Sequence, residues 1–259
     1  MPELVLYENC PLCGGDQIVD HRVGNCSKHA LYKSILSPEI LWKKCATCQH
    51  IFRNGYYTEE MCQVVFGSTH DNQKVGYDIE QQRVISSRMV EKILPFQSTG
   101  IWLDVGFGNG SLLFTAQEYG FVPTGIDLRA ANVEAIKALG IAAFCQDIKL
   151  LKLESRCSVI SMADVLEHMP YPKDGLKAAY DLLEDGGILF LSMPNFENVL
   201  WQLMDAANVN PYWGELEHYH NFSRSRLYSL LREFGFKPLR YGISERYRAC
   251  MEVLAIKGR

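Results

Sequence analysis

The feature that most restricts the fold of this chain is a set of closely spaced glycines that follows a short apolar stretch. The stretch Ile101-Trp102 leads into Leu103-Asp104-Val105-Gly106-Phe107-Gly108-Asn109-Gly110. The apolar residues predict a short buried strand, and helix-forming residues follow the last glycine. Glycines at such a turn let the backbone approach a ligand without interference from a Cβ atom. The spacing predicts a nucleoside-binding turn, and an ordinary strand-to-helix turn is the simpler alternative.

Two aspartates occur where a nucleoside on such a turn needs hydrogen-bond acceptors. Asp127 closes the next predicted strand, where a carboxylate accepts hydrogen bonds from both ribose hydroxyls. Asp147 follows the third predicted strand, within reach of an adenine edge. Each aspartate taken alone is equally well explained as a helix cap. A nicotinamide dehydrogenase also competes, but its G-x-G-x-x-G spacing differs from the G-x-G-x-G found here.

The carboxyl-terminal part of the chain alternates strand and helix signals. We expect a helix from Tyr77 to Leu94, which Pro95 ends. The expected strands are 101–105, one ending at 125–127, 141–145, 157–163, 187–193, 237–243 and 248–257. Strands separated by helices predict an α/β fold with a doubly wound, mostly parallel, seven-stranded sheet. The last two strands have only a tight link between them, so the final strand should be antiparallel.

Together these motifs resemble those of the class I S-adenosylmethionine-dependent methyltransferases, in which D-V-G-x-G-x-G is the first motif. The resemblance covers about residues 77–257 and includes the segments Val159–Pro170 and Leu183–Asn195. It implies S-adenosylmethionine as the cofactor, with the glycines along its methionine half, Asp127 at the ribose, and Asp147 with Ile148 at the adenine. The residues expected at the cofactor are Asp104, Gly106, Gly108, Gly110, Asp127, Leu128, Asp147, Ile148, Ala163, Asp164 and His168.

Two residues of the helix ahead of this domain are further candidates for the cofactor site. The ring of Tyr77 can shield a sulfonium, and the guanidinium of Arg83 can pair with the methionyl carboxylate. A surface helix that carries ordinary charges explains Arg83 almost as well.

Four cysteines near the amino terminus are spaced as metal ligands. Cys10-x2-Cys13 and Cys45-x2-Cys48 form two knuckles that can offer their thiolates to one tetrahedral Zn²⁺. A segment of this length has too small an apolar core to fold well alone, and a structural metal supplies the deficit. Four unrelated buried thiols are the first alternative. A site made of Cys10, Cys13, Cys26 and His29 is the second.

The phrase from Leu41 to Asn54 resembles the second knuckle of the zinc ribbon that precedes many bacterial methyltransferase domains of sugar and natural-product pathways, which favours Cys45 and Cys48. A site of four cysteines has no open coordination position and should be structural. The predicted division is a zinc-ribbon-like module at 1–57, a helical connector at 58–97 and a methyltransferase domain at 98–259.

The segment from Gly214 to Ser223 carries the candidate catalytic residues. It follows the fifth predicted strand and precedes a helix that Ser223 can cap, so we expect a loop over the cofactor cleft. His218 and His220 would titrate near neutrality and can act as general bases, and Glu217 can orient either ring. A lid held together by its own side chains is the alternative. The stretch resembles an E-H-x-x-x-F-S pattern at the acceptor site of relatives, which favours His218.

A second arrangement for catalysis uses a divalent metal. Asp164, Glu167 and His168 share one face if the segment after the fourth strand is helical. The ubiquinone-pathway O-methyltransferases and the small-RNA 3′-terminal 2′-O-methyltransferases are similar here, and the latter bind a divalent ion through E-x-x-E-H and another histidine. Asp stands here in place of their first Glu. The alternative is that Glu167 and His168 shape a metal-free sulfonium pocket.

Composition narrows the partners. The formal net charge of −4 over 259 residues disfavours nucleic acid, and no apolar run approaches a membrane span. The first residues show no basic n-region and no sustained apolar stretch, and nine cysteines suggest metal binding in a reducing compartment, so we expect a cytoplasmic protein. The leading hypothesis is methyl transfer to an oxygen or carbon of a small molecule: a sugar, a sugar nucleotide or a natural-product intermediate. RNA methylation, with the zinc module docking RNA near Lys43, Lys44 and Arg53, and a non-catalytic zinc-ribbon interaction protein are the competitors.

Overall fold

The computed structural model describes residues 4–66 and 71–258, and the chain divides into two compact units. Unit 1 contains residues 1–69, 166–172 and 194–228, and unit 2 contains 70–165, 173–193 and 229–259. This differs from the predicted division at residues 57 and 97, because two later segments of the chain join the amino-terminal part. The predicted connector is also split, since α1 (Glu59–Phe66) lies in unit 1 and α2 (Ile79–Ile93) in unit 2.

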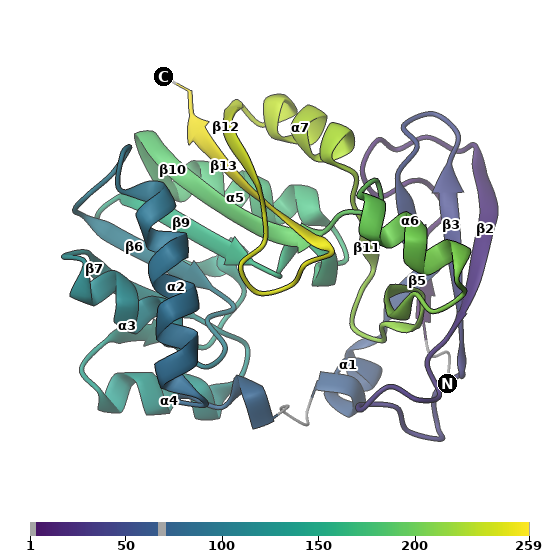
Figure 1. Cartoon of the computed structure of the whole chain (residues 1–259), viewed down its shortest axis with the longest axis horizontal. Helices are drawn as coiled ribbons and strands as arrows, with labels where there is room; N and C mark the ends of the chain where they lie inside the picture. The colour runs from purple at the N-terminus through teal and green to yellow at the C-terminus, as the bar shows by residue number, and fades with distance from the viewer. Residues whose placement is uncertain (1–3, 67–70, 259) are drawn as a thin grey trace. The chain divides into compact units, whose positions relative to one another are not determined.

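Unit 2 is built on a seven-stranded sheet in the order β12–β13–β10–β9–β6–β7–β8 (Figure 1). The strands are β6 (Ile101–Val105), β7 (Val122–Ile126), β8 (Ala142–Phe144), β9 (Cys157–Ala163), β10 (Leu183–Pro194), β12 (Phe236–Ile243) and β13 (Cys250–Lys257). The pairs β10–β9, β9–β6, β6–β7 and β7–β8 are parallel, whereas β12 and β13 are antiparallel. The α/β fold, the mostly parallel sheet and the antiparallel final strand are therefore confirmed.

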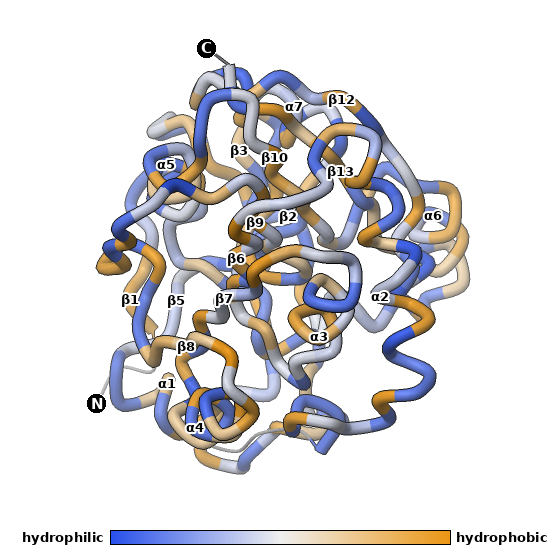
Figure 2. Tube along the Cα trace, turned by 90° about the vertical axis from the view of Figure 1, so that its left-hand side faces the viewer, coloured by the Kyte–Doolittle hydropathy of each residue, from blue (hydrophilic) through white to orange (hydrophobic). Residues whose placement is uncertain are grey.

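The helices of unit 2 are of two kinds, α-helices with buried apolar side chains and short 3-10 helices. They are α2, α3 (Ser111–Glu118), α4 (Ala130–Ala138), α5 (Pro172–Leu182), the end of α7 (Arg224–Glu233), and the short 3-10 helices η1 (Asp71–Gln73) and η2 (Ile148–Leu150). Figure 2 shows hydrophilic and hydrophobic residues alternating along α2. Its buried side chains Met89, Val90 and Ile93 pack with Trp102 of β6 and Phe190 of β10. This helix and the strands thus share one core.

Unit 1 contains a four-stranded sheet in the order β11–β4–β3–β2. Its strands are β2 (Ile18–Asn25), β3 (Glu39–Cys45), β4 (Ile51–Arg53) and β11 (His220–Asn221), and a second, two-stranded sheet joins β1 (Leu4–Leu6) to β5 (Gly55–Tyr57). The unit also holds α1, α6 (Val199–Ala206) and the 3-10 helices η3 (Leu166–His168) and η4 (Pro211–Gly214). Among the described residues, no helix is both long and apolar enough to cross a membrane.

An aromatic core explains why residues 194–228 belong to unit 1. Trp42 of β3 donates its indole N–H to the carbonyl oxygen of Trp213 at 2.9 Å, and their ring centroids lie 5.7 Å apart. Trp201 of α6 packs edge-on against Trp213, with ring centroids 5.3 Å apart. Trp201 and Trp213 add large apolar rings to Trp42, so the later segment completes the core of the amino-terminal part. The segment predicted as a loop over the cleft instead contributes β11, which pairs with β4.

The close approach of η4 to β2 depends on Gly24, and it leads to a first prediction. A Cβ atom at Gly24 would lie 1.7 Å from the carbonyl oxygen of Trp213, so Gly24→Ala must push the two segments apart. We expect it to lower the free energy of unfolding of unit 1 by about 1 to 3 kcal/mol. Urea unfolding followed by tryptophan fluorescence measures this change, because Trp42, Trp201 and Trp213 all lie in unit 1.

Gly242 provides the matched control for this prediction. It is also a strand glycine, and a Cβ atom there would meet nothing within 4 Å. Gly242→Ala should change stability by less than about 0.5 kcal/mol. Equal destabilisation by the two substitutions would contradict the close approach.

Candidate functional site

The glycine turn at the end of β6 adopts backbone angles that side chains disfavour. The φ angles of Gly106, Gly108 and Gly110 are 66°, 55° and 78°. A Cβ atom at Gly110 would lie 2.8 Å from the Ile136 side chain, whereas one at Gly108 would meet only the carbonyl oxygen of Gly106, at 3.9 Å. Gly110 is therefore needed for packing. Around the Cα atom of Gly108 there is space for a ligand to approach the turn.

Asp127 lies beside this turn, and its carboxylate accepts four hydrogen bonds from within the protein. Oδ2 accepts hydrogen bonds from the backbone N–H of Gly108 at 3.1 Å and from Nη2 of Arg129 at 2.7 Å. Oδ1 accepts from the backbone N–H of Arg129 at 2.9 Å and from its Nε at 2.8 Å. A carboxylate offers about four acceptor positions, so these four donors occupy all of them. Two ribose hydroxyls can bind Asp127 only if the Arg129 guanidinium moves away.

Arg129, Gln73 and Asn132 are residues of this region that the sequence pattern missed. The Arg129 guanidinium also donates to the side-chain oxygen of Gln73. The side-chain amide of Asn132 donates to the carbonyl oxygens of Gln73 and Gly108, at 2.9 and 3.0 Å. Residues around η1 are thereby tied to the glycine turn. The available signal was the position of an arginine two residues after the predicted ribose acid.

The other predicted cofactor residues of unit 2 occupy the ends of its strands. Asp104 is buried in β6 and accepts a hydrogen bond from the Ser161 hydroxyl at 2.6 Å. Burial raises the pKa of Asp104 to about 6. Ala163 is buried at the end of β9, and Asp164 follows it with a φ of 58° and accepts from the Ser192 hydroxyl at 2.9 Å.

After β8, Asp147 is placed so that both explanations fit, a contact with adenine and a helix cap. Its carboxylate accepts a hydrogen bond from the backbone N–H of Lys149 and so caps η2. Ile148 beside it is buried, and Leu128 after β7 is exposed. An exposed apolar side chain next to the ribose acid suits an adenine ring that would cover it.

Tyr77 and Arg83 are both on the surface of unit 2. Tyr77 lies in a turn before α2 rather than in the helix, and it is 46% exposed. The Arg83 guanidinium forms a two-pronged ion pair with Glu118, with Nε at 2.9 Å from both carboxylate oxygens. The geometry therefore favours the surface alternative for Arg83.

Four thiols converge in unit 1. The Sγ atoms of Cys10, Cys13, Cys45 and Cys48 all lie within 4.8 Å of one another. Two of the separations, Cys10–Cys48 and Cys13–Cys45, are 3.6 Å. Four sulfurs placed about 2.3 Å from a tetrahedral Zn²⁺ are about 3.8 Å apart, so the geometry fits that ion.

Cys26 and His29 have partners elsewhere in unit 1. The Cys26 thiol lies 3.3 Å from the carbonyl oxygens of Ser37 and Pro38, and His29 Nε2 lies 2.5 Å from the Glu215 carboxylate. The structure thus joins Cys10 and Cys13 to Cys45 and Cys48, as the preferred ligand set requires.

A second group of ligand-type side chains in unit 1 consists of Glu167, His168 and His218. One potential ligand atom from each lies within 4.8 Å of the others. His168 Nδ1 lies 2.9 Å from the carbonyl oxygen of Glu217, so Nδ1 carries the proton and Nε2 is free to accept or to bind a cation. His218 Nδ1 is buried and has no hydrogen-bond partner among the described residues. A buried ring nitrogen without such a partner is available to a ligand or a cation.

This group differs from the predicted metal site. Asp164 has a left-handed backbone, and η3 begins only at Leu166, so Asp164, Glu167 and His168 do not form one helical face. His218 takes the place that was expected for Asp164. The Asp164 carboxylate instead accepts a hydrogen bond from the Ser192 hydroxyl, and its Oδ2 lies 3.7 Å from Nη1 of Arg246.

The expectation that His218 and His220 titrate near neutrality is wrong. Burial and the nearby His168 lower the pKa of His218 to about 3, and burial lowers the pKa of His220 to about 4. Both rings are neutral at pH 7. A ring with so low a pKa is a weaker base than a free imidazole.

Glu217 and His220 also have partners other than those expected. A Glu217 carboxylate oxygen lies within 4.8 Å of ligand atoms of His29 and Glu215. His220 Nδ1 lies 3.0 Å from His50 Nε2, and its own Nε2 lies 2.9 Å from the carbonyl oxygen of Met169. His220 is fully buried, so it cannot contact an acceptor.

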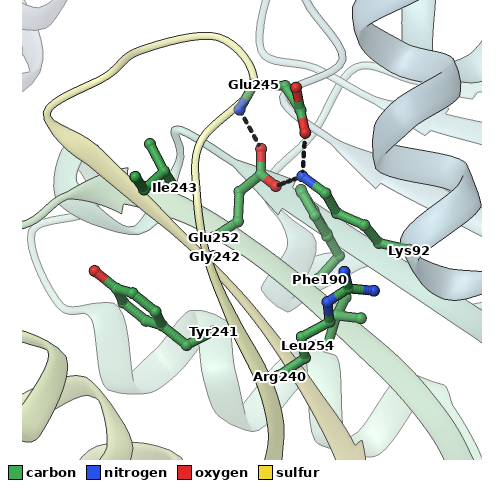
Figure 3. Close-up of a pocket in the computed structure, with 9 residues that line it drawn as sticks. All are labelled: Lys92, Phe190, Arg240, Tyr241, Gly242, Ile243, Glu245, Glu252 and Leu254. Carbon is green, nitrogen blue, oxygen red and sulfur yellow. Dashed lines mark hydrogen bonds and ion pairs between the residues drawn. The ribbon is translucent and has the colours of Figure 1, made fainter.

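A cavity of about 240 Å³ lies in unit 2 among α2, β10 and the β12–β13 hairpin. Figure 3 shows Lys92 reaching from α2 toward two glutamates on its wall. Lys92 Nζ lies 2.5 Å from Glu245 and 2.6 Å from the buried Glu252, which also accepts from the Glu245 backbone N–H at 2.8 Å. Lys92 thus bridges the two glutamates and ties α2 to the β12–β13 hairpin.

Comparison with known proteins agrees with the fold and the glycine turn. The sheet order, with a glycine turn after β6 and an acid after β7, defines a class I S-adenosylmethionine-dependent methyltransferase. A family model described as a methyltransferase domain matches residues 77–241, more than half of the chain. The chain therefore belongs to this methyltransferase family.

The curated relatives match only part of this chain, at about one third identity. The ubiquinone biosynthesis O-methyltransferase of Coxiella burnetii is 33% identical over 116 residues, which cover 41% of this chain and 50% of that protein. The enzyme of the same description from Colwellia psychrerythraea is 30% identical over 147 residues, or 52% and 60% of the two chains. The chain thus spans about half the length of the curated relatives it matches.

Solved structures show the same fold at low identity. Magnesium protoporphyrin IX methyltransferase of Synechocystis, solved with bound S-adenosylhomocysteine, has a TM-score of 0.54 and 19% identity over 70% of this chain and 84% of its own. An S-adenosylmethionine-dependent methyltransferase of Clostridium acetobutylicum has a TM-score of 0.54 and 13% identity over 77% and 97% of the two chains.

Proposed function

We propose that the enzyme transfers the methyl group of S-adenosylmethionine to an oxygen or carbon of a small molecule: a sugar, a sugar nucleotide or a natural-product intermediate. The carrying observation is the pairing of an open glycine turn with the buried acid Asp127 at the ends of two neighbouring strands. The cofactor supplies an electrophilic methyl on a sulfonium. The chain binds and orients it, aligns the acceptor, and removes a proton from a hydroxyl or carbon acid.

In this proposal Gly106, Gly108 and Gly110 line the methionine half of the cofactor and Asp127 accepts the ribose hydroxyls. The Arg129 guanidinium is exchanged for the ribose, since both need the same carboxylate acceptors. Asp147 and Ile148 bound the adenine, and Leu128 lies beside them. Asp104 and Asp164 hold the strand ends in place through the Ser161 and Ser192 hydroxyls.

The second prediction tests this arrangement. Asp127→Ala removes charge-assisted hydrogen bonds to two hydroxyls, which together contribute about 1.5 to 3 kcal/mol, so affinity for S-adenosylhomocysteine should fall about 10- to 150-fold. Isothermal titration calorimetry measures the change. Affinity equal to that of the wild type would remove Asp127 from the site.

Arg129→Ala is the matched control for the same experiment. It keeps the acid and removes its competing donors, so its affinity for S-adenosylhomocysteine should equal or exceed that of the wild type. A loss as large as that of Asp127→Ala would mean that Arg129 supports the acid rather than exchanging with the ribose.

We propose that Cys10, Cys13, Cys45 and Cys48 hold a structural Zn²⁺. The fit of the sulfur spacing to a tetrahedron supports this. The ion would join the loop before β2 to the turn between β3 and β4.

For the acceptor we propose His218 as the general base. Its buried Nδ1 supports this role, because it has no hydrogen-bond partner among the described residues and is available to a proton of the acceptor. The alternative is a divalent cation held by Glu167, His168 and His218, which would lower the pKa of an acceptor hydroxyl. The similarity to enzymes described as ubiquinone biosynthesis O-methyltransferases favours an oxygen acceptor on a small molecule.

RNA is a weaker candidate for the acceptor. Arg53 is buried over the Tyr57 ring and donates to the carbonyl oxygen of Leu216, while Lys43 pairs with Asp20 at 2.7 Å. Two of the three basic residues near the second knuckle are thus engaged within the protein. Phosphate binding needs such groups to face outward.

A further inference from the structure

Two fully buried histidines, His50 and His220, form a hydrogen-bonded pair in unit 1. His50 Nε2 lies 3.0 Å from His220 Nδ1, and the two rings are stacked with centroids 5.2 Å apart. His220 Nε2 lies 2.9 Å from the carbonyl oxygen of Met169 and 3.3 Å from that of Pro170. Three groups distant in the sequence therefore form one line of contacts.

The donor and acceptor of each hydrogen bond follow from the carbonyl oxygen of Met169, at which the line ends. A carbonyl oxygen only accepts, so His220 Nε2 carries the proton and donates to Met169. A neutral His220 ring then has a bare Nδ1, which must accept from a proton on His50 Nε2. The reverse tautomer would place two acceptors against each other at Met169. Both rings are thus protonated at Nε2.

One end of this line is fixed to the second cysteine knuckle. The carbonyl oxygen of His50 accepts a hydrogen bond from the backbone N–H of Cys45 at 2.9 Å, which closes the turn that contains Cys48. The His50 side chain therefore projects from the knuckle itself.

The other end of the line is the peptide segment that presents Glu167 and His168. Met169 directly follows η3, and its carbonyl oxygen is held by His220. A second hydrogen bond holds the carbonyl group of Glu167 in the same segment. The backbone N–H of Tyr219 donates to the carbonyl oxygen of Glu167 at 2.8 Å, and the Tyr219 carbonyl oxygen accepts from the N–H of Arg53 at 2.8 Å.

We infer that His50 and His220 are positioning residues that connect the second cysteine knuckle to the Glu167–His168–His218 group. They fix η3, so that Glu167 and His168 keep their place relative to His218. This inference rests on the proposed function of that group at the acceptor. It gives the four-cysteine module a role in arranging the reaction, beyond its own stability.

The tautomers provide the first test and need no substitution. In the zinc-loaded wild-type protein with ¹⁵N-labelled histidine, long-range ¹H–¹⁵N spectra should show His50 and His220 each protonated at Nε2 and bare at Nδ1. A scalar coupling across the His50 Nε2–His220 Nδ1 hydrogen bond is also expected. A proton on His220 Nδ1 would overturn the inference.

A matched pair of variants provides the second test. His50→Leu removes the donor and leaves a buried acceptor unsatisfied, whereas His50→Gln keeps an N–H near the position of Nε2. Amide hydrogen exchange of residues 166–172 should become about 5- to 150-fold faster in His50→Leu, the range that a lost buried hydrogen bond implies. In His50→Gln it should stay near the wild-type rate.

Further measurements distinguish this connection from simple destabilisation and from failure of the proposed function. Zinc content and the affinity for S-adenosylhomocysteine should stay at wild-type values in both variants. If exchange changes only near residues 45–52, or equally in both variants, the connection is absent. If His50→Leu loses its zinc, His220→Leu, which breaks the same line away from the knuckle, must reproduce the faster exchange at 166–172. Failure of the wild type to bind S-adenosylhomocysteine would contradict the proposed function and leave the exchange result standing.

Discussion

Replacement of His218 by alanine is expected to lower turnover about 10²- to 10⁴-fold, the usual contribution of a general base. The affinity for S-adenosylhomocysteine should not change, because the residue acts only when the acceptor loses its proton. The reason for assigning it this role is its buried Nδ1, which has no hydrogen-bond partner in the described part of the chain. The assay measures S-adenosylhomocysteine formed with an acceptor selected from a panel of sugar nucleotides and phenols.

His21→Ala is the control, because His21 is an exposed histidine of the same unit and should leave turnover unchanged. Chelation separates the two accounts of His218. If it holds a cation together with Glu167 and His168, EDTA should abolish turnover and added Mg²⁺ or Mn²⁺ should restore it. Turnover that resists EDTA but falls in His218→Ala supports the base. Undiminished turnover in His218→Ala would contradict both accounts.

Cys45→Ser is expected to release zinc and to unfold the four-cysteine part of unit 1. Binding of a structural Zn²⁺ to thiolates contributes about 10 to 16 kcal/mol in zinc-finger peptides, more than the whole stability of a typical domain. Metal analysis of protein purified without chelator should give one zinc per wild-type chain and none for the variant. Tryptophan fluorescence should report the loss of structure around Trp42 and Trp213.

Cys26→Ser is the matched control, because Cys26 is also a buried cysteine of unit 1 and its thiol lies 3.3 Å from the carbonyl oxygens of Ser37 and Pro38, away from the four-cysteine cluster. It should retain one zinc per chain. Zinc retained by Cys45→Ser and lost by Cys26→Ser would restore the ligand set with Cys26 and His29.

The strands and helices of unit 2 could be predicted because each is encoded by a local pattern. Apolar runs such as 157–163 and 101–105 are buried on both faces, and turn residues separate them from the helices. Which segments of the chain make up unit 1 could not be predicted in this way. The β11–β4 pair joins His220 to Phe52 and Asn221 to Ile51, and no local periodicity encodes a partner so far along the chain.

The candidate site was predictable where a residue acts by its own chemistry. Glycines with positive φ and an acid at a strand end carry their signal in the sequence. His50 carries none and Arg129 only its position two residues after the acid, because their roles depend on what folding places beside them. The pKa of His218 was missed for the same reason, since burial in unit 1 cannot be read from the two-residue spacing of His218 and His220.

Calorimetric titration of the wild-type protein with S-adenosylhomocysteine, and separately with NAD, tests the central claim most directly. The glycine turn and Asp127 predict one site per chain with micromolar affinity for S-adenosylhomocysteine, and no binding of NAD. Binding of NAD without binding of S-adenosylhomocysteine would contradict the assignment of this turn to a methyl donor.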